Sequence, residues 1–250
     1  MKEDDLKILS GRERIPQGII YKDYVITVVL EKISELTYSD TLVFKGGTCI
    51  KKIFFEDARF SVDIDFTCLD DVSERIFTDL ETVLGNHRVY DVDFDDMKTD
   101  ERREDSVRYR IKYRDLNEHP NSVKLDLSFR ETPILKTKKR KILNPFYEDI
   151  PTFKLRTLEL KEIMAEKIRA AVTRTAPRDL FDIWYLLKKG VETDLRLVGE
   201  KMNIYQENFD KGIFLDKMED KRVDWVRDLR TLIPDSPEFD MVKDEVSRYI

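Results

Sequence analysis

The chain has 250 residues, of which 41% are hydrophobic and 38% charged, with a formal net charge of −6. This composition is typical of a folded globular protein and excludes a disordered or collagen-like chain. With only 2 cysteines and 2 histidines, a disulfide framework and zinc hydrolase chemistry are also disfavoured. We expect a cytoplasmic protein without a signal peptide or membrane span, whose chemistry depends on carboxylates, lysines and backbone groups.

The first half of the sequence predicts alternating helices and strands. Apolar residues at helical spacing predict helices over residues 21–36 and 73–84. Short apolar or alternating runs predict five strands, over residues 41–44, 61–67, 89–94, 107–113 and 123–129.

The second half of the sequence is helical in pattern. One helix is predicted over residues 158–172 with Thr157 as its N-cap, and Pro177 opens a second that ends before Gly190. Residues 194–250 show helical spacing throughout. A helix-rich C-terminal part therefore follows the strands.

These patterns predict an α+β (mixed α/β) fold in two regions. Residues 1–150 would form the mixed α/β core, and residues 151–250 would form a helical region. Neither region contains an internal repeat or a long glycine- or proline-rich linker, so we expect the two regions to follow each other directly.

The strand predicted over residues 61–67 carries two carboxylates on one face. Alternation places Asp63 and Asp65 together, with Ser61 on the same side. Two such carboxylates repel unless a cation lies between them, and Mg²⁺ accepts carboxylate oxygens. If the strand over residues 123–129 is a neighbour, Asp126 joins them as a third carboxylate suited to phosphoryl or nucleotidyl transfer. The alternative is a solvent-exposed strand face.

A glycine pair distinguishes this carboxylate set from a similar one at Asp91, Asp93 and Asp95. Gly46, Gly47 and Thr48 directly follow an apolar strand and open a helical stretch. Glycines in that position let the backbone approach a phosphate group. The alternative interpretation of the glycine pair is an ordinary tight turn.

These residues also resemble a known family. Lys45-Gly46-Gly47-Thr48 followed by Arg59-Phe60-Ser61-Val62-Asp63-Ile64-Asp65 is similar to the signature of DNA-polymerase-β-like nucleotidyltransferases, and in detail to that of the AbiEii/AbiGii toxins. A second block that resembles this family comprises Glu166-Lys167-Ile168-Arg169-Ala170, Arg174 and Pro177-Arg178-Asp179-Leu180-Phe181-Asp182. The matching motifs span roughly residues 42–188.

The resemblance implies a polymerase-β-like sheet with flanking helices and a helical C-terminal region that completes the active site. It implies transfer of a nucleoside monophosphate from an NTP to an acceptor, with Mg²⁺ as the metal and Mn²⁺ as the alternative. The residues assigned to the nucleotide are Gly46, Gly47, Thr48, Ser61, Lys167, Arg178 and Asp179. Those assigned to catalysis are Asp63, Asp65, Asp126, Lys167 and Asp182, and the metal ligands among them are Asp63, Asp65 and Asp126.

The resemblance also implies partners. Some members of this family act on tRNA ends and are paired with an antitoxin, so RNA is the acceptor that we expect. Two alternatives remain at this stage. The same fold could act on a protein or small-molecule acceptor, or it could be a non-catalytic binding module.

The second motif block also has structural interpretations. Lys167 borders an apolar helical stripe, where a lysine either extends to solvent or reaches a phosphate. Asp179 lies in the first turn after Pro177, where the helix dipole favours an acid. Asp182 lies among apolar residues and needs a partner, for which Arg174 or Arg178 is the nearest candidate.

Two basic stretches offer candidate contacts for a nucleic acid. Alternation over residues 107–114 places four cations on one strand face, where they would guide a phosphate backbone, neutralise the carboxylates or be balanced by residues 91–95. The run over residues 136–141 is interpreted as a solvated loop. The four cations are Arg108, Arg110, Lys112 and Arg114.

Overall fold

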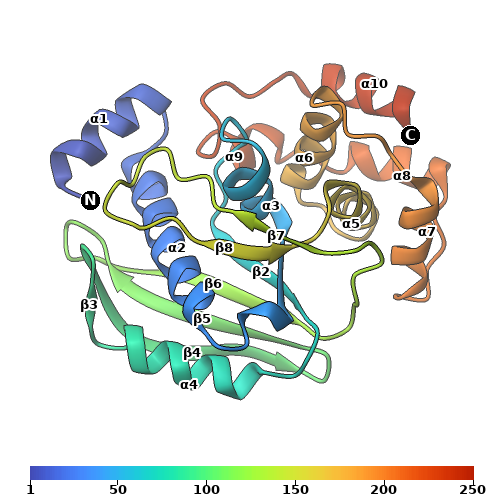
Figure 1. The fold of residues 1–250 in the computed structure, drawn as a ribbon. Helices are drawn as coiled ribbons and strands as arrows, with labels where there is room; N and C mark the ends of the chain where they lie inside the picture. Colours follow the sequence, from blue (N-terminus) through green and yellow to red (C-terminus); the bar gives the residue numbers. More distant parts are fainter. The chain divides into compact units, whose positions relative to one another are not determined.

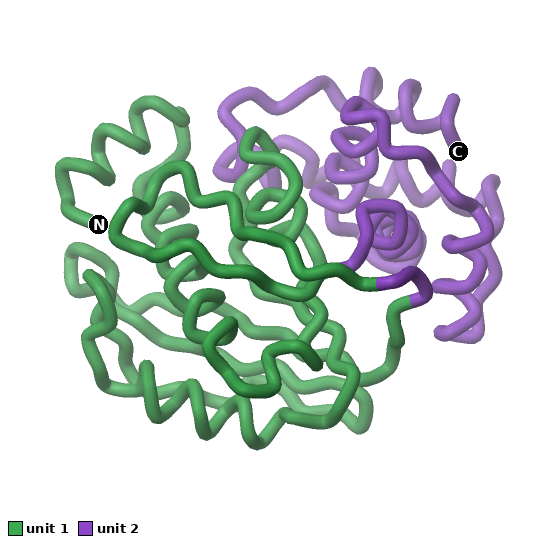
Figure 2. The backbone as a smooth tube through the Cα atoms, viewed as in Figure 1, with its two compact units in different colours: residues 1–133, 137–157 green, residues 134–136, 158–250 purple.

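The computed structural model describes residues 1–250, which form two compact units (Figure 2). Unit 1 comprises residues 1–133 and 137–157, and unit 2 comprises residues 134–136 and 158–250. No helix in the chain combines the length and apolar character that crossing a membrane requires. The two units are described separately below.

Unit 1 is built on an eight-stranded sheet with the order β3-β4-β5-β6-β2-β1-β8-β7 (Figure 1). The strand pairs β2–β6 and β1–β8 are parallel, and the other pairs are antiparallel. The strands are β1 (Leu42–Lys45), β2 (Asp63–Cys68), β3 (Arg88–Val89), β4 (Val92–Arg103), β5 (Ser106–Arg114), β6 (Pro120–Ser128), β7 (Lys138–Lys141) and β8 (Lys154–Thr157).

Helices cover the apolar face of this sheet. Tyr21 of α2 contacts Tyr113 of β5 with ring centroids 6.0 Å apart, and Phe77 of α4 contacts Tyr109 at 5.1 Å. Because both tyrosines point to the same side of β5, α2 and α4 lie on one face. The helical segments of unit 1 are α1 (Glu3–Glu13), α2 (Gln17–Glu35), η1 (Ser39–Thr41), α3 (Gly46–Cys49), η2 (Ile50–Phe54) and α4 (Ser73–Leu84).

The alternation of β5 shows why the sheet has one apolar and one polar face. Its apolar side chains are at most 3% exposed, whereas the polar side chains between them are partly exposed. Burial of each large apolar side chain stabilises the fold by about 1.5–3 kcal/mol. The register of the strands is therefore fixed, and the polar residues must share the opposite face.

Unit 2 is helical, and its first two helices carry the second motif block. Pro177 occupies the first turn of α6, and Gly190 beyond its end has a φ of 78°, as expected for a helix terminus. The Glu162 carboxylate of α5 accepts hydrogen bonds from the backbone N–H groups of Ile134 and Leu135, each at 2.9 Å. The helices are α5 (Leu160–Thr173), α6 (Pro177–Lys188), α7 (Leu195–Asn203), α8 (Lys211–Glu219), α9 (Trp225–Leu229) and α10 (Phe239–Tyr249).

The structure confirms the predicted mixed fold and corrects several elements. The helix predicted over residues 73–84 has those bounds as α4. Thr157 is not a helix N-cap, because it ends strand β8 and its hydroxyl accepts a hydrogen bond from Arg140 at 2.7 Å. The predicted loop over residues 136–141 contains β7, and α1 and β8 were also not predicted. These short elements lack the apolar periodicity on which the prediction depended.

Candidate active site

The three predicted carboxylates lie on adjacent strands of unit 1. Strands β2 and β6 are parallel neighbours, with Asp65 opposite Asp126 and Asp63 opposite Lys124. Side chains at paired positions point to the same side of the sheet, so all three carboxylates share the polar face. The two strands are thus neighbours, which is the condition under which Asp126 joins Asp63 and Asp65.

The predicted glycine turn lies directly against this face. Lys45 ends β1 opposite Asp65, and Gly46 then turns with a φ of 76°, which L side chains rarely adopt. A Cβ on Gly46 would overlap with the Asp65 carboxylate. A Cβ on Gly47 would lie 2.7 Å from Arg59 Nη2 and 3.2 Å from Ser61 Oγ. Gly46 is therefore required by its positive φ and its close approach to Asp65, beyond the needs of an ordinary turn, and Gly47 packs closely against Arg59 and Ser61.

Thr48 connects the turn to the carboxylate strand. Its side chain is buried, and its hydroxyl donates a hydrogen bond to the Asp63 carbonyl oxygen. The residue preceding α3, Lys45, is extended and provides no side-chain hydrogen bond to the helix start. Thr48 thus fixes the glycine turn and the first residue of β2 relative to each other.

Arg108 of β5 engages the third carboxylate. Its Nε donates a hydrogen bond of 2.6 Å to Asp126 Oδ1, and its Nη1 lies 3.5 Å from Glu101 Oε2. Burial raises the pKa of the Asp126 carboxyl above its ordinary value; Arg108 opposes the rise, and the Asp63 carboxylate adds to it. Burial likewise lowers the pKa of Lys22 on α2, against the opposing effect of Asp63. Asp63 and Asp126 therefore interact electrostatically.

The carboxylate oxygens of this face are ligands of the kind that a divalent cation binds. Asp63 and Asp65 offer carboxylate oxygens at positions i and i+2 of one strand, which are the ligands that Mg²⁺ and Mn²⁺ prefer. In the residues 1–250 described, no group of three or more Asp, Glu, His or Cys side chains converges on a metal position. Asp126 is directed to Arg108 instead. The residues thus fit a two-carboxylate site with a third carboxylate on the adjacent strand.

The basic face of β5 is balanced by acidic residues. Through the Arg108–Asp126 pair, this face is continuous with the carboxylates of β2 and β6. The other three cations pair with carboxylates of the neighbouring strand β4, which confirms a charge-balanced face, although residues 91 and 93 pair with Arg88 instead. These pairs are Arg110–Asp100 at 2.6 Å, Lys112–Asp96 at 3.1 Å and Arg114–Asp95 at 3.1 Å.

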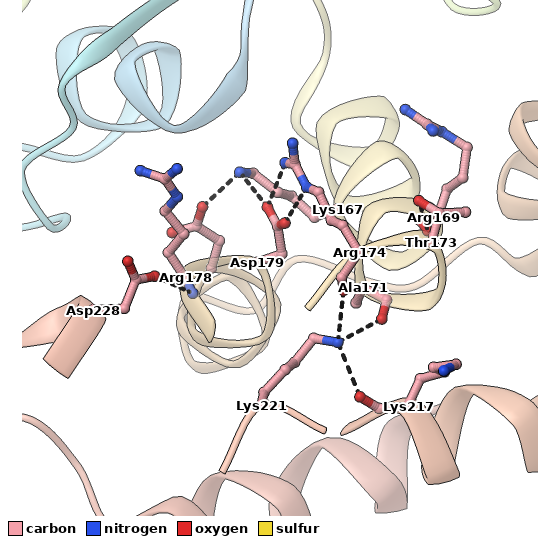
Figure 3. A network of polar contacts seen from close by, with 11 residues as sticks. Lys167, Arg169, Ala171, Thr173, Arg174, Arg178, Asp179, Lys217, Lys221 and Asp228 are labelled. Atoms are coloured by element: carbon pink, nitrogen blue, oxygen red, sulfur yellow. Dashed lines mark hydrogen bonds and ion pairs between the residues drawn. The ribbon is translucent and has the colours of Figure 1, made fainter. Parts of the chain in front are cut away.

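The second motif block forms a buried ionic cluster in unit 2 (Figure 3). Lys167 Nζ lies 3.0 Å from Asp179 Oδ1 and 2.8 Å from Asp182 Oδ2. Arg174 Nε donates a hydrogen bond of 2.6 Å to Asp179 Oδ2. Burial alone would raise the pKa of Asp179, but Lys167 and Arg174 together hold it well below its usual value.

The cluster provides a partner for each of these buried charged residues. Lys167 is 7% exposed and contacts two carboxylates, so it does not extend to solvent. Asp182 has Lys167 as a partner, where the sequence favoured Arg174 or Arg178. The backbone N–H of Arg178 donates to Asp228 Oδ2 at 3.4 Å. Lys167, Asp179 and Asp182 are thus brought together.

Sequence reasoning missed the supporting lysines of unit 2. Lys201 Nζ lies 2.9 Å from Glu162 Oε1 and 3.0 Å from Glu166 Oε1. Lys221 Nζ donates to three backbone carbonyl oxygens (Figure 3). Both lysines are at most 1% exposed. The signal in the sequence that could have indicated them is a lysine within an apolar helical pattern.

The mixed sheet with a glycine turn packed against paired carboxylates is the arrangement that the resemblance to nucleotidyltransferases implies. Residues 28–245 match the family described as nucleotidyl transferase AbiEii toxin, type IV TA system. Since this match covers most of the sequence, the chain belongs to this toxin family, and the resemblance of its motifs is confirmed. No curated protein matches the sequence.

Solved structures show the same fold. JHP933 from Helicobacter pylori is 17% identical with a TM-score of 0.62, over 94% of this chain and 91% of that one. A putative nucleotidyltransferase from H. pylori is 17% identical with a TM-score of 0.63, over 94% of each chain. MenT4, a nucleotidyltransferase toxin from Mycobacterium tuberculosis H37Rv, is 18% identical with a TM-score of 0.66, over 93% of this chain and 82% of that one. The predicted fold class is confirmed.

Substitution of Gly46 tests the close approach of the glycine turn to Asp65. Gly46→Ala should lower the free energy of unfolding by at least about 1 kcal/mol, because it combines a positive φ with overlap on the carboxylate. The matched control is Gly18→Ala in α2, where a Cβ meets nothing within 4 Å. That variant should be stabilised by about 0.5–1 kcal/mol. Denaturant unfolding measures both, and equal effects of the two substitutions would contradict the geometry.

Lys221 predicts a pH dependence of stability. Burial lowers its pKa from 10.5 to about 8, so between these pH values the unfolded state binds more protons than the folded state. The free energy of unfolding of the wild type should therefore rise with pH relative to that of Lys221→Met, by up to about 3 kcal/mol. Denaturant unfolding of both proteins from pH 7 to 10.5 measures this difference. A constant difference across the range would show that Lys221 has an ordinary pKa.

Proposed function

We propose that this protein is a Mg²⁺-dependent nucleotidyltransferase toxin that transfers a nucleoside monophosphate from an NTP to RNA, with tRNA ends as the acceptor. The observation that carries this proposal is the placement of Asp63, Asp65 and Asp126 on one face, against the glycine turn. Membership of the AbiEii family supports the reaction class. As a member of a toxin–antitoxin family, the protein would also bind a cognate antitoxin.

The residues of unit 1 have distinct roles in this proposal. Gly46 and Gly47 would present backbone N–H groups to the triphosphate, from a turn that packs closely against Asp65 and Ser61. Thr48 holds the turn in register with Asp63. Asp63 and Asp65 would hold Mg²⁺, with Mn²⁺ as the alternative, and Asp126 would complete the site from β6. When bound, the metal would neutralise the triphosphate and stabilise the charge that develops during transfer.

The transfer itself is a single displacement at phosphorus. An acceptor hydroxyl oxygen forms a bond to the α-phosphorus, the bond between that phosphorus and the α–β bridging oxygen breaks, and pyrophosphate leaves. The hydroxyl proton must leave in the same reaction. It passes to solvent water, while Arg108 holds the Asp126 carboxylate in place for the metal site.

We assign the second motif block to the phosphates of the NTP on the chemistry of its residues. Lys167 carries a compact positive charge, and Asp179 and Asp182 hold its ammonium in one position. Arg178 lies on the same first turn of α6 as Asp179, and its backbone is held by Asp228. Loss of Lys167 would therefore lower kcat/KM for the NTP.

The edge of the sheet supports a polyanionic acceptor. In the β7–β8 pair, Lys141 lies directly opposite Lys154, and both are exposed. Like charges placed opposite each other destabilise a sheet unless an anion lies close. Lysines also protect edge strands against pairing with other chains, which is the alternative role. A phosphate backbone that docks on β7 and β8 would satisfy both charges.

Substitution of Asp63 tests the proposed reaction. Purified protein with Mg²⁺ and labelled NTPs should label RNA, and Asp63→Asn should lower the rate by at least 10³-fold through loss of charge at the metal position. Asp93→Asn is the matched control, because Asp93 belongs to the other alternating set and pairs with Arg88 at 2.8 Å. Incorporation into total tRNA, protein and small acceptors measures the outcome. Equal labelling by the two variants would contradict the assignment.

The acceptor surface is tested by charge reversal. The double variant Lys141→Glu/Lys154→Glu should reduce transfer to RNA at least tenfold and weaken its salt dependence, with the KM for NTP unchanged. The control is Lys2→Glu/Lys211→Glu, which has the same net charge and alters exposed positions elsewhere. Steady-state kinetics at several salt concentrations measure the effect. Unchanged RNA kinetics would assign the lysines to edge protection alone.

A further inference from the structure

Lys221 is a buried cation that lies outside every motif of the sequence. It follows α8, and its side chain is 0% exposed. Its Nζ donates hydrogen bonds to the carbonyl oxygens of Ala171 at 2.6 Å, Arg174 at 3.1 Å and Lys217 at 3.0 Å (Figure 3). All three N–H groups of the ammonium can therefore be satisfied by backbone.

Ala171 lies in the last turn of α5, and Arg174 is the residue that follows the helix. Helix α5 ends at Thr173, and the last carbonyl groups of a helix have no partner within it. A cation at that end satisfies them and interacts favourably with the helix dipole. Lys221 therefore supplies the cap that α5 lacks locally, from about fifty positions further along the chain.

Arg174 connects this cap to the ionic cluster. Its carbonyl oxygen accepts from Lys221, while its guanidinium donates to both carboxylate oxygens of Asp179, at 2.6 and 3.0 Å. Asp179 in turn accepts from Lys167 at 3.0 Å. Because the Arg174 side chain is 58% exposed, packing contributes little to its orientation. The backbone of residue 174 must then be held for the guanidinium to stay on Asp179.

Other residues of the C-terminal segment contact the same two helices. Lys201 holds Glu162 and Glu166 on α5, and Asp228 accepts from the N–H group of Arg178 on α6. The segment thus supplies α5 with buried ion pairs and a C-terminal cap, and it supplies α6 with an acceptor for a backbone N–H group. Lys221 is the member of this set that acts on the junction between α5 and α6.

We propose that Lys221 is a positioning residue. It holds the backbone of Arg174, so that the side chains of Arg174, Asp179 and Lys167 keep the arrangement that binding and reaction of the NTP require. This inference rests on the proposed function of Lys167. It gives the segment after residue 190 a role in the reaction, through the geometry of the cluster rather than through contact with the substrate.

The test compares Lys221→Met with Lys217→Met. Methionine fills a similar volume without an ammonium, and the Lys217 side chain is 48% exposed and pairs with Asp220 at 2.9 Å. We expect Lys221→Met to lower kcat/KM for NTP at least tenfold and Lys217→Met to leave it unchanged. Combined with Asp179→Asn, Lys221→Met should cause no further loss, because both act on one array. Wild-type kcat/KM in Lys221→Met, or fully additive losses, would overturn the proposal.

Hydrogen exchange provides a readout that does not depend on activity. Amides of residues 174–179, other than Pro177, should exchange faster in Lys221→Met than in wild type, while those of α10 should be unchanged. Unchanged exchange at residues 174–179 overturns the positioning role whatever the activity. If wild type transfers no nucleotide to any acceptor, the proposed function fails while the exchange result still decides the positioning role.

Lys221→Gln tests the same proposal if Lys221→Met does not fold. Lys221→Gln retains two N–H donors on a shorter side chain and should keep α5 partly capped. We expect intermediate exchange at residues 174–179 and an intermediate kcat/KM for NTP. A folded Lys221→Gln protein with wild-type exchange and wild-type kinetics would overturn the proposal.

Discussion

The close approach of Gly46 to the Asp65 carboxylate is the constraint on which the arrangement of unit 1 depends. No side chain fits at Gly46, so the turn after β1 can lie directly against the carboxylate strand. Antiparallel pairing of β1 with β2 and parallel pairing of β2 with β6 then bring Asp65 opposite Asp126. One glycine position and two strand registers thus place the glycine turn beside three carboxylates.

Charge is balanced locally around both motif blocks, although the chain as a whole is acidic. Arg108 faces Asp126 in unit 1, and Lys167 and Arg174 face Asp179 in unit 2. Lys167 and Asp179 are both buried, and removing one of them leaves a charge without compensation, which costs several kcal/mol. These pairs hold the charged side chains of both motif blocks in fixed positions. Fixed charges of this kind lower the reorganisation that a transferase must carry out during reaction.

Much of the fold follows from sequence patterns, and the exceptions have physical reasons. Alternation located β2 and the polar face that carries Asp63, and helical spacing gave the bounds of α4. Strand β7 has the sequence Lys-Lys-Arg-Lys, which carries no apolar alternation, so no periodicity marked it. The pairing of Arg108 with Asp126 depends on register between strands, and the capping of α5 by Lys221 joins residues far apart in sequence. The apolar pattern around Lys221 marks a buried lysine, but the partner in neither contact can be read from the local sequence.

The central claim is that Asp63 and Asp65, beside the glycine turn, hold the metal and triphosphate of an NTP. Its most direct test is anomalous diffraction from crystals grown with Mn²⁺ and a non-hydrolysable NTP analogue. The account predicts a manganese peak within coordination distance of both carboxylates, with the triphosphate over residues 46–48. A bound analogue with its manganese at another part of the chain, and none at Asp63 and Asp65, would contradict it.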